Sequence, residues 1–379
     1  MSFENRRRRR WLLALYCAGV LIATWQRGLS PTSRDHSTFT IFRQSFVHLA
    51  AHQNLYASYP EEQGAASVHK FKYSPSAAVL FAPLSAVPYP VALLFWNALN
   101  AGLLLYALAK LLPAGRANLA MLILAPEVFV AIQASSSNAL VTALIILAAM
   151  AYQEERVARA AMTVATGVAI KIFPLAAFSL AVLQRRWKEA ALAAACAGIV
   201  LFALPLLVAS PAELLQQYRW WWALERSDAQ DVMFGLSLMR QFRGWWGVEW
   251  PNWMIQLIGT LGFLLPLALR RGRWSDGSFQ RTFLCSLLVY VTIFNHQAER
   301  QSFVIAAAGC TIWYVMGRKS VERSVLLFLA IIGVPTVPYL IMWLAMQAEL
   351  LRGIPSASSA AVDRVPDIGS SSAPLQRAS

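Results

Sequence analysis

The sequence predicts an all-α polytopic membrane protein, and three observations support that class. Of the 379 residues, 58% are hydrophobic and only 14% are charged, whereas an average soluble domain is about 25% charged. Apolar runs of about 20 residues recur along the chain, separated by short polar links. Basic residues gather beside these runs, as they do in the cytoplasmic links of membrane proteins. We therefore expect one domain over 1–352, a bundle of roughly 10–12 transmembrane helices, followed by a disordered tail over 353–379 that is rich in Ser, Ala and Pro.

The apolar runs predict the helices in order, and three of them are irregular. The segment 75–88 is short for a crossing, 157–184 contains Lys171 and Pro174 and could be two half-helices, and 324–351 contains two prolines. The candidate spans are 11–29, 75–88, 90–112, 118–134, 138–152, 157–184, 189–209, 253–270, 281–295, 301–317 and 324–351.

The amino terminus predicts the orientation of the chain in the cell membrane. Five arginines at 6–10 precede the first apolar run and should hold that end in the cytoplasm. That run lacks a small-residue cleavage site, so it is not a cleaved signal peptide. Simple alternation of the spans then places the basic links 113–116 and 154–159 outside, against the charge rule. A half-helix or re-entrant segment between 75 and 184 would remove this conflict, and the sequence does not say which one.

Two long polar segments are predicted to lie outside, at 28–74 and 210–252. The first contains an amphipathic helix, suited to the membrane interface, whose apolar face comprises Phe39, Phe42, Phe46, Leu49 and Ala50.

The second outer segment is rich in tryptophan, with YRWWWALE at 218–225 and FRGWWGVEWPNW at 242–253. Tryptophan at this density favours anchoring at the level of the lipid headgroups. Stacking against a sugar ring is the alternative.

The net charge of +14 does not indicate nucleic-acid binding. The basic residues occur in short clusters beside apolar runs, where they match anionic lipid headgroups. A phosphate-binding surface would instead gather them on one face.

No metal or cofactor is predicted. The four cysteines lie inside apolar runs without metal-ligand spacing. His48 and His52 have the i, i+4 spacing that zinc sites also use, but no third ligand stands at a suitable distance in the sequence. We interpret them as two exposed histidines on one helical turn.

Asp35 is the first acidic residue after the first apolar run. A lone carboxylate just above the hydrocarbon is suited to act as a base toward a substrate held in the membrane. Because it follows Thr32 and Ser33 at an expected helix start, it could instead be a helix N-cap.

Four segments, taken in order, resemble glycosyltransferase family 87. Tyr73 lies in an aromatic-Tyr-x-Pro start, Gln133 and Asn138 form a Gln-x-x-x-x-Asn element, and Lys171 opens a Lys-aromatic-Pro segment. Ile132 stands where the family's element has Gly. The four segments are RDHSTFTIFRQSFVHLAAHQNLY at 34–56, FKYSPSAAVLFAPLSAVPYPVALLFWNALN at 71–100, IQASSSNALVTALIILA at 132–148 and AIKIFPLAAFSLAVLQRRWK at 169–188.

The resemblance implies a membrane glycosyltransferase of the GT-C class. Its members move a sugar, usually mannose, from a polyprenyl monophosphate to a glycolipid or glycan on the outer face, and its acid in the first outer loop falls on Asp35. His296 fits the family's His position, while Glu299 and Arg300 beside it depart from many relatives. The residues expected to bind substrate are Arg43, Tyr73, Gln133, Asn138, Lys171, His296, Glu299 and Arg300.

The chemistry of sugar transfer agrees with these residue types. Inverting transfer needs a base on the acceptor hydroxyl and stabilisation of the leaving phosphate. No second carboxylate stands near Asp35 in the sequence, so a retaining double displacement is less natural. No Asp-x-Asp motif marks a nucleotide-sugar metal site.

A transporter or lipid-handling protein without catalysis is the alternative function. A membrane scaffold would not need this combination of acid, broken helix and basic outer residues.

Overall fold

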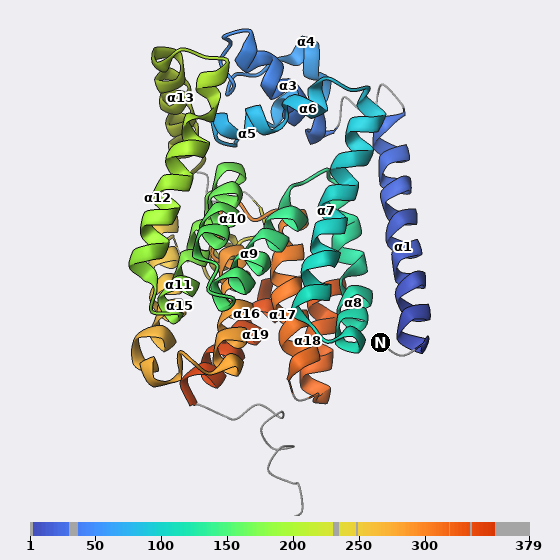
Figure 1. Ribbon diagram of the computed structural model, residues 1–379, viewed down its shortest axis with the longest axis vertical. Helices are drawn as coiled ribbons and strands as arrows, with labels where there is room; N and C mark the ends of the chain where they lie inside the picture. Colours follow the sequence, from blue (N-terminus) through green and yellow to red (C-terminus); the bar gives the residue numbers. More distant parts are fainter. Residues whose placement is uncertain are drawn as a thin grey trace, which may run out of the picture.

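The computed structural model describes residues 3–29, 37–229, 235–247, 249–317, 319–333 and 336–352. These residues form α-helices and short 3-10 helices, with no strand among them. The all-α polytopic class is therefore confirmed. The helices make a tall bundle capped at one end by shorter helices (Figure 1). The predicted tail over 353–379 lies outside the described residues.

The bundle consists of helices that run between two faces of the molecule (Figure 1). These are α1 (Phe3–Gly28), α7 (Tyr89–Leu111), α8 (Ala114–Gln133), α9 (Asn138–Gln153), α10 (Val157–Ile170), α11 (Ser179–Leu183), α12 (Trp187–Ala203), α15 (Asn252–Leu269), α16 (Gly277–Ile293), α17 (Phe303–Met316), α18 (Val321–Ile332) and α19 (Thr336–Arg352), with the 3-10 helices η2 (Phe173–Phe178), η3 (Leu204–Leu207) and η4 (Arg271–Arg273).

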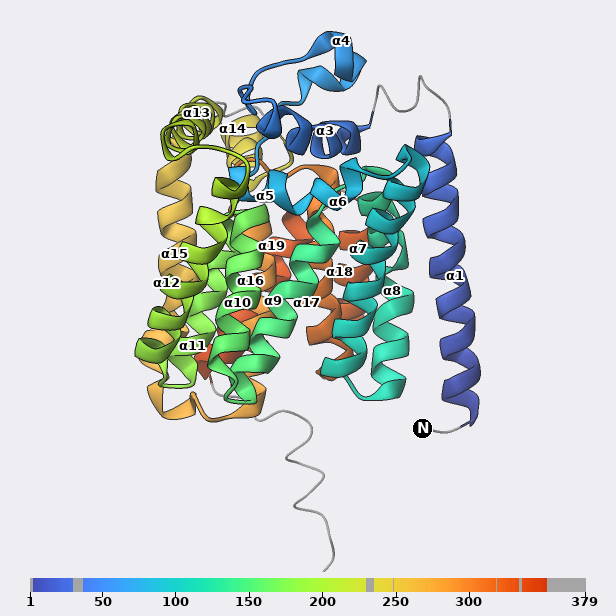
Figure 2. The same cartoon turned by 45° about the horizontal axis from the view of Figure 1, so that its top comes forward.

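A second layer of helices lies across one end of the bundle, which we call the loop face (Figure 2). The opposite end carries the amino terminus, and we call it the N-terminal face. The cap comprises α3 (Thr38–Ala50), α4 (Pro60–Gln63), α5 (Pro75–Leu80), α6 (Ala82–Ser85), α13 (Pro211–Ala229) and α14 (Leu238–Trp246), with η1 (Gly64–Val68) and, in the loop before α17, η5 (Arg300–Ser302).

Four helices in the described part of the chain are long and apolar enough to cross a membrane: Tyr89–Leu111, Ala114–Gln133, Trp187–Leu207 and Asn252–Leu269. The other bundle helices are shorter or carry more charge. At about 1.5 Å per residue, a crossing of about 30 Å needs about 20 helical residues. The bundle therefore mixes full-length helices with half-length ones.

The segment 75–88 does not cross the bundle, contrary to its place among the predicted spans. It forms the two short helices α5 and α6, which lie in the cap beside α3 (Figure 2). Prolines interrupt the helical hydrogen bonds here. The Arg43 guanidinium donates to the carbonyls of Leu84 at 3.2 Å and of Ser85 and Val87 at 3.0 Å each. The carbonyls released by the irregular backbone are thus satisfied within the cap.

The segment 157–184 is a helical hairpin, as the sequence allowed. α10 rises from the N-terminal face and ends at Ile170, and η2 with α11 returns toward the same face (Figure 1). Lys171 adopts an extended backbone at the turn. At the base of the hairpin, Arg186 donates to Glu155 at 2.8 Å. The two half-helices together make no net crossing.

These two irregular segments remove the conflict in the predicted topology. Without a crossing at 75–88, the link at 113–116 falls on the N-terminal face, and so does 154–159. Two contacts agree: Asn118 donates to the Asn5 carbonyl at 3.2 Å, and Gln153 to Gln280 at 3.2 Å. All the basic links now gather at one end of the bundle.

The core lies along α16 and α17, which are buried over nearly their whole circumference and pack directly on each other. Helices that are apolar on all sides belong in such an interior. By contrast, α12 and α15 expose large apolar side chains, including Leu192, Ile199, Leu257 and Leu261. In a membrane those surfaces face lipid.

The predicted amphipathic helix in the first outer segment is α3. It buries Phe39, Phe42 and Leu49, while Phe46 is only half-buried and Ala50 is exposed. His48, expected on the exposed side, is buried as well. Ser37 caps the helix by accepting a hydrogen bond from the Phe39 backbone at 3.3 Å.

Candidate functional site

A cavity of about 1340 Å³ lies where the cap meets the bundle. Its lining comes from α3, the segment before α5, the start of α9, the α10–η2 hairpin, α13, α15, α16 and the loop before α17. Segments far apart in the sequence therefore share one space.

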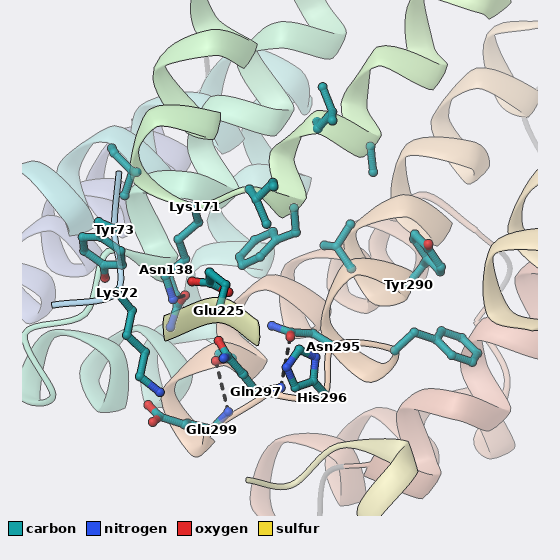
Figure 3. Close-up of a pocket in the computed structure, with 18 of the residues that line it drawn as sticks. Lys72, Tyr73, Asn138, Lys171, Glu225, Tyr290, Asn295, His296, Gln297 and Glu299 are labelled. Carbon is teal, nitrogen blue, oxygen red and sulfur yellow. Dashed lines mark hydrogen bonds between the residues drawn. The ribbon is translucent and has the colours of Figure 1, made fainter. Parts of the chain in front are cut away.

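The end of the cavity nearest the cap is polar. Its labelled side chains surround one opening in Figure 3 and include two lysines, two glutamates, a histidine and several amides. They are Lys72, Tyr73, Asn138, Lys171, Glu225, Asn295, His296, Gln297 and Glu299.

The cavity turns apolar as it follows α15 toward the N-terminal face. The helix lines it with Gln256, Thr260, Phe263, Leu264 and Leu267, a spacing that places all five on one helical side. The first two of these side chains are polar, and the apolar part, from Phe263 to Leu267, is about 6 Å long. The returning half of the hairpin faces it with further apolar side chains, including those of Leu175, Phe178 and Val182. The cavity is therefore amphiphilic along its length.

Lys171 and Asn138 meet at the polar end, each at the end of a helix. The Lys171 ammonium donates to the Asn138 side-chain oxygen at 2.8 Å. It also lies 5.7 Å from the ring centre of Phe173 and 5.9 Å from that of Tyr73. Within the described residues, no carboxylate approaches Lys171 to ion-pairing distance. Its charge is thus met by dipoles and rings, which leaves the cavity a positive centre.

Asn138 is held in a fixed orientation. Its side-chain nitrogen donates to the Gln301 carbonyl at 2.9 Å and to the Ser136 hydroxyl at 3.3 Å. With both donors used in this way, its oxygen is the atom turned toward Lys171 (Figure 3). The asparagine therefore positions the lysine.

Tyr73 closes the side of the cavity next to these two residues. Its hydroxyl lies 3.0 Å from the Ser137 hydroxyl, and its carbonyl accepts from Tyr56 at 3.0 Å. Burial raises the pKa of the Tyr73 hydroxyl far above its ordinary value. The phenol therefore stays protonated and remains a hydrogen-bond donor.

The loop before α17 brings His296 and Glu299 to the cavity. His296 Nδ1 lies 3.3 Å from the Gln256 amide of α15, and Gln301 donates to the Glu299 carboxylate. The loop is also held from the cap: the Leu236 backbone donates to the Ala298 carbonyl at 2.6 Å. Gly235, at φ +74°, makes this approach possible, because a side chain there would overlap that carbonyl.

Arg300 has a different environment from its neighbours. Its guanidinium makes a two-pronged ion pair with Glu127 of α8, with both N–O distances 2.6 Å. The Glu127 side chain is fully buried and that of Arg300 is 37% exposed. Arg300 is not among the residues that line the cavity. The pair instead ties the loop carrying His296 and Glu299 to the bundle.

Two further predicted site residues, Arg43 and Gln133, do not line the cavity. Arg43 binds carbonyls of the α6–α7 link, as described above. Gln133 donates to Gln26 of α1 at 2.8 Å on the exposed side of α8. Asp35 lies outside the described residues. The five that line the cavity are Tyr73, Asn138, Lys171, His296 and Glu299.

The cavity also contains polar residues absent from the predicted set. Trp221 and Glu225 come from α13, and Gln256, Asn295 and Gln297 come from α15 and the loop before α17. A signal for the first two existed in their i, i+4 spacing, which places them on one side of a helix. The run of three tryptophans concealed which one faces inward.

The described residues contain no group of three or more His, Cys, Asp or Glu side chains able to hold a metal ion. The two histidines with zinc-like spacing have separate partners. His48 lies 2.8 Å from Glu62 and is stacked on Tyr59, while His52 lies 3.0 Å from Glu213 of α13. They help to hold the cap together.

The comparison with known families agrees with this geometry. The family model for glycosyltransferase family 87 matches residues 71–294, which is more than half of the chain and includes most of the cavity lining. No curated protein matches the chain. From the family match, and from the apolar helices of membrane-spanning length, this chain belongs to glycosyltransferase family 87 and is a membrane glycosyltransferase.

Proposed function

We propose that the protein moves a hexose, with mannose the expected sugar, from a polyprenyl monophosphate carrier to a glycolipid or glycan on the extracytoplasmic face of the cell membrane. The observation that carries this proposal is the amphiphilic cavity: a polar end beside the cap, which contains the buried Lys171, continued by an apolar strip along α15. A sugar phosphate on an isoprenoid chain is likewise polar at one end and apolar along the rest of its length.

The apolar strip favours a lipid-linked donor over a nucleotide sugar. Its lining of Phe263, Leu264 and Leu267, opposite Phe178 and Val182, provides carbon surface and no partner for a base or ribose. This apolar part, about 6 Å along α15, would contact the start of the isoprenoid chain. The single phosphate would then lie at the polar end.

Lys171 is the proposed phosphate partner. The acceptor oxygen attacks the anomeric carbon from the side opposite the phosphate, and the carbon–oxygen bond to the phosphate breaks with inversion. The polyprenyl phosphate that leaves gains one negative charge. A cation in a site with little water stabilises that charge strongly. His296, across the same opening, would donate a further hydrogen bond (Figure 3).

Asp35 is the proposed base, which takes the proton of the acceptor hydroxyl. Its support comes from its neighbours along the chain. The Ser37 hydroxyl lies 3.4 Å from that of Ser135, and Thr38, which lines the cavity, donates to the Ala134 carbonyl at 2.8 Å. The first described residues after Asp35 in the sequence are thus at or beside the cavity, which supports the proposal.

The loop face is proposed to be extracytoplasmic and the amino terminus cytoplasmic. The basic links at 6–10, 113–116, 184–188 and 270–274 gather at the N-terminal face, as the charge rule requires of the cytoplasmic side. The cap, and with it the polar end of the cavity, then lies where lipid-linked sugars are delivered.

The deciding experiment is transfer by the purified protein with lipid-linked or nucleotide-linked sugar supplied separately, in EDTA. We expect turnover with the polyprenyl-phosphate sugar alone.

Asp35→Asn should fold normally and lose transfer by several orders of magnitude, since an amide accepts no proton. Glu61→Gln, an exposed change in the same outer segment, is the matched control and should be active. Activity with the nucleotide sugar alone, or full turnover by Asp35→Asn, would contradict the proposal.

Orientation has its own test, in a variant whose four native cysteines are replaced. Glu61→Cys in the cap and Arg271→Cys at the N-terminal face both place a thiol on an exposed residue. A membrane-impermeant thiol reagent should label the first in intact cells and the second only after lysis. The reverse pattern would place the loop face in the cytoplasm.

A further inference from the structure

We propose that Trp221 and Glu225 of α13 form a hexose-binding subsite for the acceptor, so that the acceptor presents a sugar ring rather than a simple lipid alcohol. This inference rests on the proposed function and specifies the chemistry of its second substrate. It starts from the way α13 divides its aromatic residues between two faces.

The tryptophans of the cap and of the first turn of α15 have two different environments. Trp222, Trp245, Trp246 and Trp253 are each more than half exposed, in line with anchoring at the headgroups. Trp221, next to Trp222 in the sequence, instead lines the cavity. Anchoring at the headgroups is therefore the interpretation that fits the exposed tryptophans. Trp221, in contrast, is placed where a sugar ring in the cavity could stack against it.

The Trp221 ring is fixed before any ligand arrives. Its indole nitrogen donates to the Lys72 carbonyl at 3.3 Å, which leaves the hydrocarbon surface of the ring for contact. The C–H face of a hexose packs well on such a rigid, flat surface. Because the tryptophan's own polar atom is already bonded, sugar hydroxyls must find their partners elsewhere.

Glu225 is placed to provide one such partner. It lies one helical turn beyond Trp221 on the same side of α13, and its carboxylate projects into the polar end of the cavity (Figure 3). A carboxylate accepts hydrogen bonds from two adjacent sugar hydroxyls. The amides of Gln256, Asn295 and Gln297 line the same space and both donate and accept. An aromatic platform with a carboxylate and amides is suited to a polyhydroxylated ring.

α13 is held rigidly enough to present a preformed subsite. Gln217 accepts from the Leu55 backbone at 3.2 Å and donates to the Gln53 carbonyl at 2.7 Å, which fixes the helix to the first outer segment. Tyr218 donates to the Phe202 carbonyl at 2.8 Å and fixes it to the top of α12. Preorganisation of this kind lowers the cost of binding.

Charge assigns the subsite to the acceptor rather than to the donor. The donor phosphate is negative and is proposed to lie beside Lys171, whereas Glu225 is itself negative and would repel it. Figure 2 shows α13 at the loop-face end of α12 and α15, whereas the apolar lining residues Phe263, Leu264 and Leu267 lie farther along α15. An acceptor from outside reaches that end first.

The test uses the full chain in lipid nanodiscs, with hexyl mannoside, hexyl glucoside and hexyl galactoside as probes and hexyl glycerol as the non-sugar probe. Saturation-transfer NMR should detect ring protons of at least one hexoside bound to the wild type and to Trp222→Leu. We expect the signal to be lost in Trp221→Leu and weakened in Trp221→Phe and Glu225→Gln. Equal signals from hexyl glycerol, or an unchanged signal in Trp221→Leu, would overturn the inference.

Turnover with the polyprenyl-phosphate sugar provides the second measurement. Trp221→Phe and Glu225→Gln should raise KM for the hexoside about tenfold or more, the effect of one lost hydrogen bond or packing contact, with the donor KM unchanged. A rise in the donor KM alone would assign the subsite to the donor sugar and overturn the inference.

Cleavage of the donor in water, measured without acceptor, tests the proposed function separately. If no donor is cleaved, the proposed function fails, while the NMR result still decides whether α13 binds a hexose.

Discussion

Two cationic side chains lie at the boundary between cap and bundle, and the structure gives them opposite roles. Lys171 lines the cavity and is met by the neutral Asn138 and two aromatic rings. Arg300 is held by both oxygens of the buried Glu127 and does not line the cavity. In the sequence Lys171 lies within the predicted span 157–184, and Arg300 directly precedes the span 301–317.

The difference shows that the role of a cationic side chain near a membrane site depends on the group that it contacts. An ion pair with two short hydrogen bonds is neutral overall and adds rigidity. Lys171 makes no ion pair within the described residues, and a phosphate would place an opposite charge beside it. Arg300, expected to bind substrate, is therefore better placed to fix the loop that carries His296.

The largest expected effect follows from breaking the ion pair. Glu127→Leu leaves the Arg300 charge without its partner and should lower the free energy of unfolding by about 3 kcal/mol, the low end for a buried pair, because Arg300 is 37% exposed. Equilibrium unfolding in mixed micelles measures this. Restoring neutrality with Glu127→Leu and Arg300→Met together should recover most of the loss; a single variant as stable as the wild type would show that the pair contributes little.

Lys171→Met should do the reverse, with little change in stability and a large loss of activity. We expect kcat/KM for the lipid-linked donor to fall about 100-fold, or about 2.7 kcal/mol, the usual effect of removing one donor to developing negative charge. Lys110→Met, near the N-terminal face at the end of α7, is the matched control and should keep full activity. If both variants transfer sugar equally well, Lys171 does not hold the phosphate.

Asn138→Ala tests whether the asparagine acts through the lysine. Alone it should lower kcat/KM about tenfold, because Lys171 loses the oxygen that orients it. Combined with Lys171→Met it should cause little further loss, a coupling that a double-mutant cycle measures directly. Additive losses would mean that Asn138 acts independently of Lys171.

The smallest effect is expected from Tyr73→Phe. The change removes one hydroxyl that bonds Ser137 and leaves the ring beside Lys171 in place. Losing a single neutral hydrogen bond lowers stability by about 1 kcal/mol, and transfer should fall only a few-fold. A loss as large as that of Lys171→Met, at normal stability, would instead place the phenol among the groups that contact substrate.

The sequence by itself determined the class of this protein and much of its outline. The apolar runs, the arginine anchor and the break at Lys171 and Pro174 are local signals, read within one helix or link. Burial of apolar side chains and the exclusion of charge from the hydrocarbon act on each segment separately, so a single sequence records them. The family resemblance rested on such local motifs as well, and it was confirmed over 71–294.

The tertiary structure alone decided which polar residues meet. The crossing predicted at 75–88 became two cap helices held by Arg43, and of two neighbouring tryptophans of α13 one lines the cavity and the other is exposed. Glu127 and Arg300 are 173 residues apart in the chain. Local periodicity reports which face of a helix is buried but not what it is buried against. A partner so distant in sequence is selected only when the whole bundle packs, because a buried charge must then be matched by whatever group the packing brings beside it.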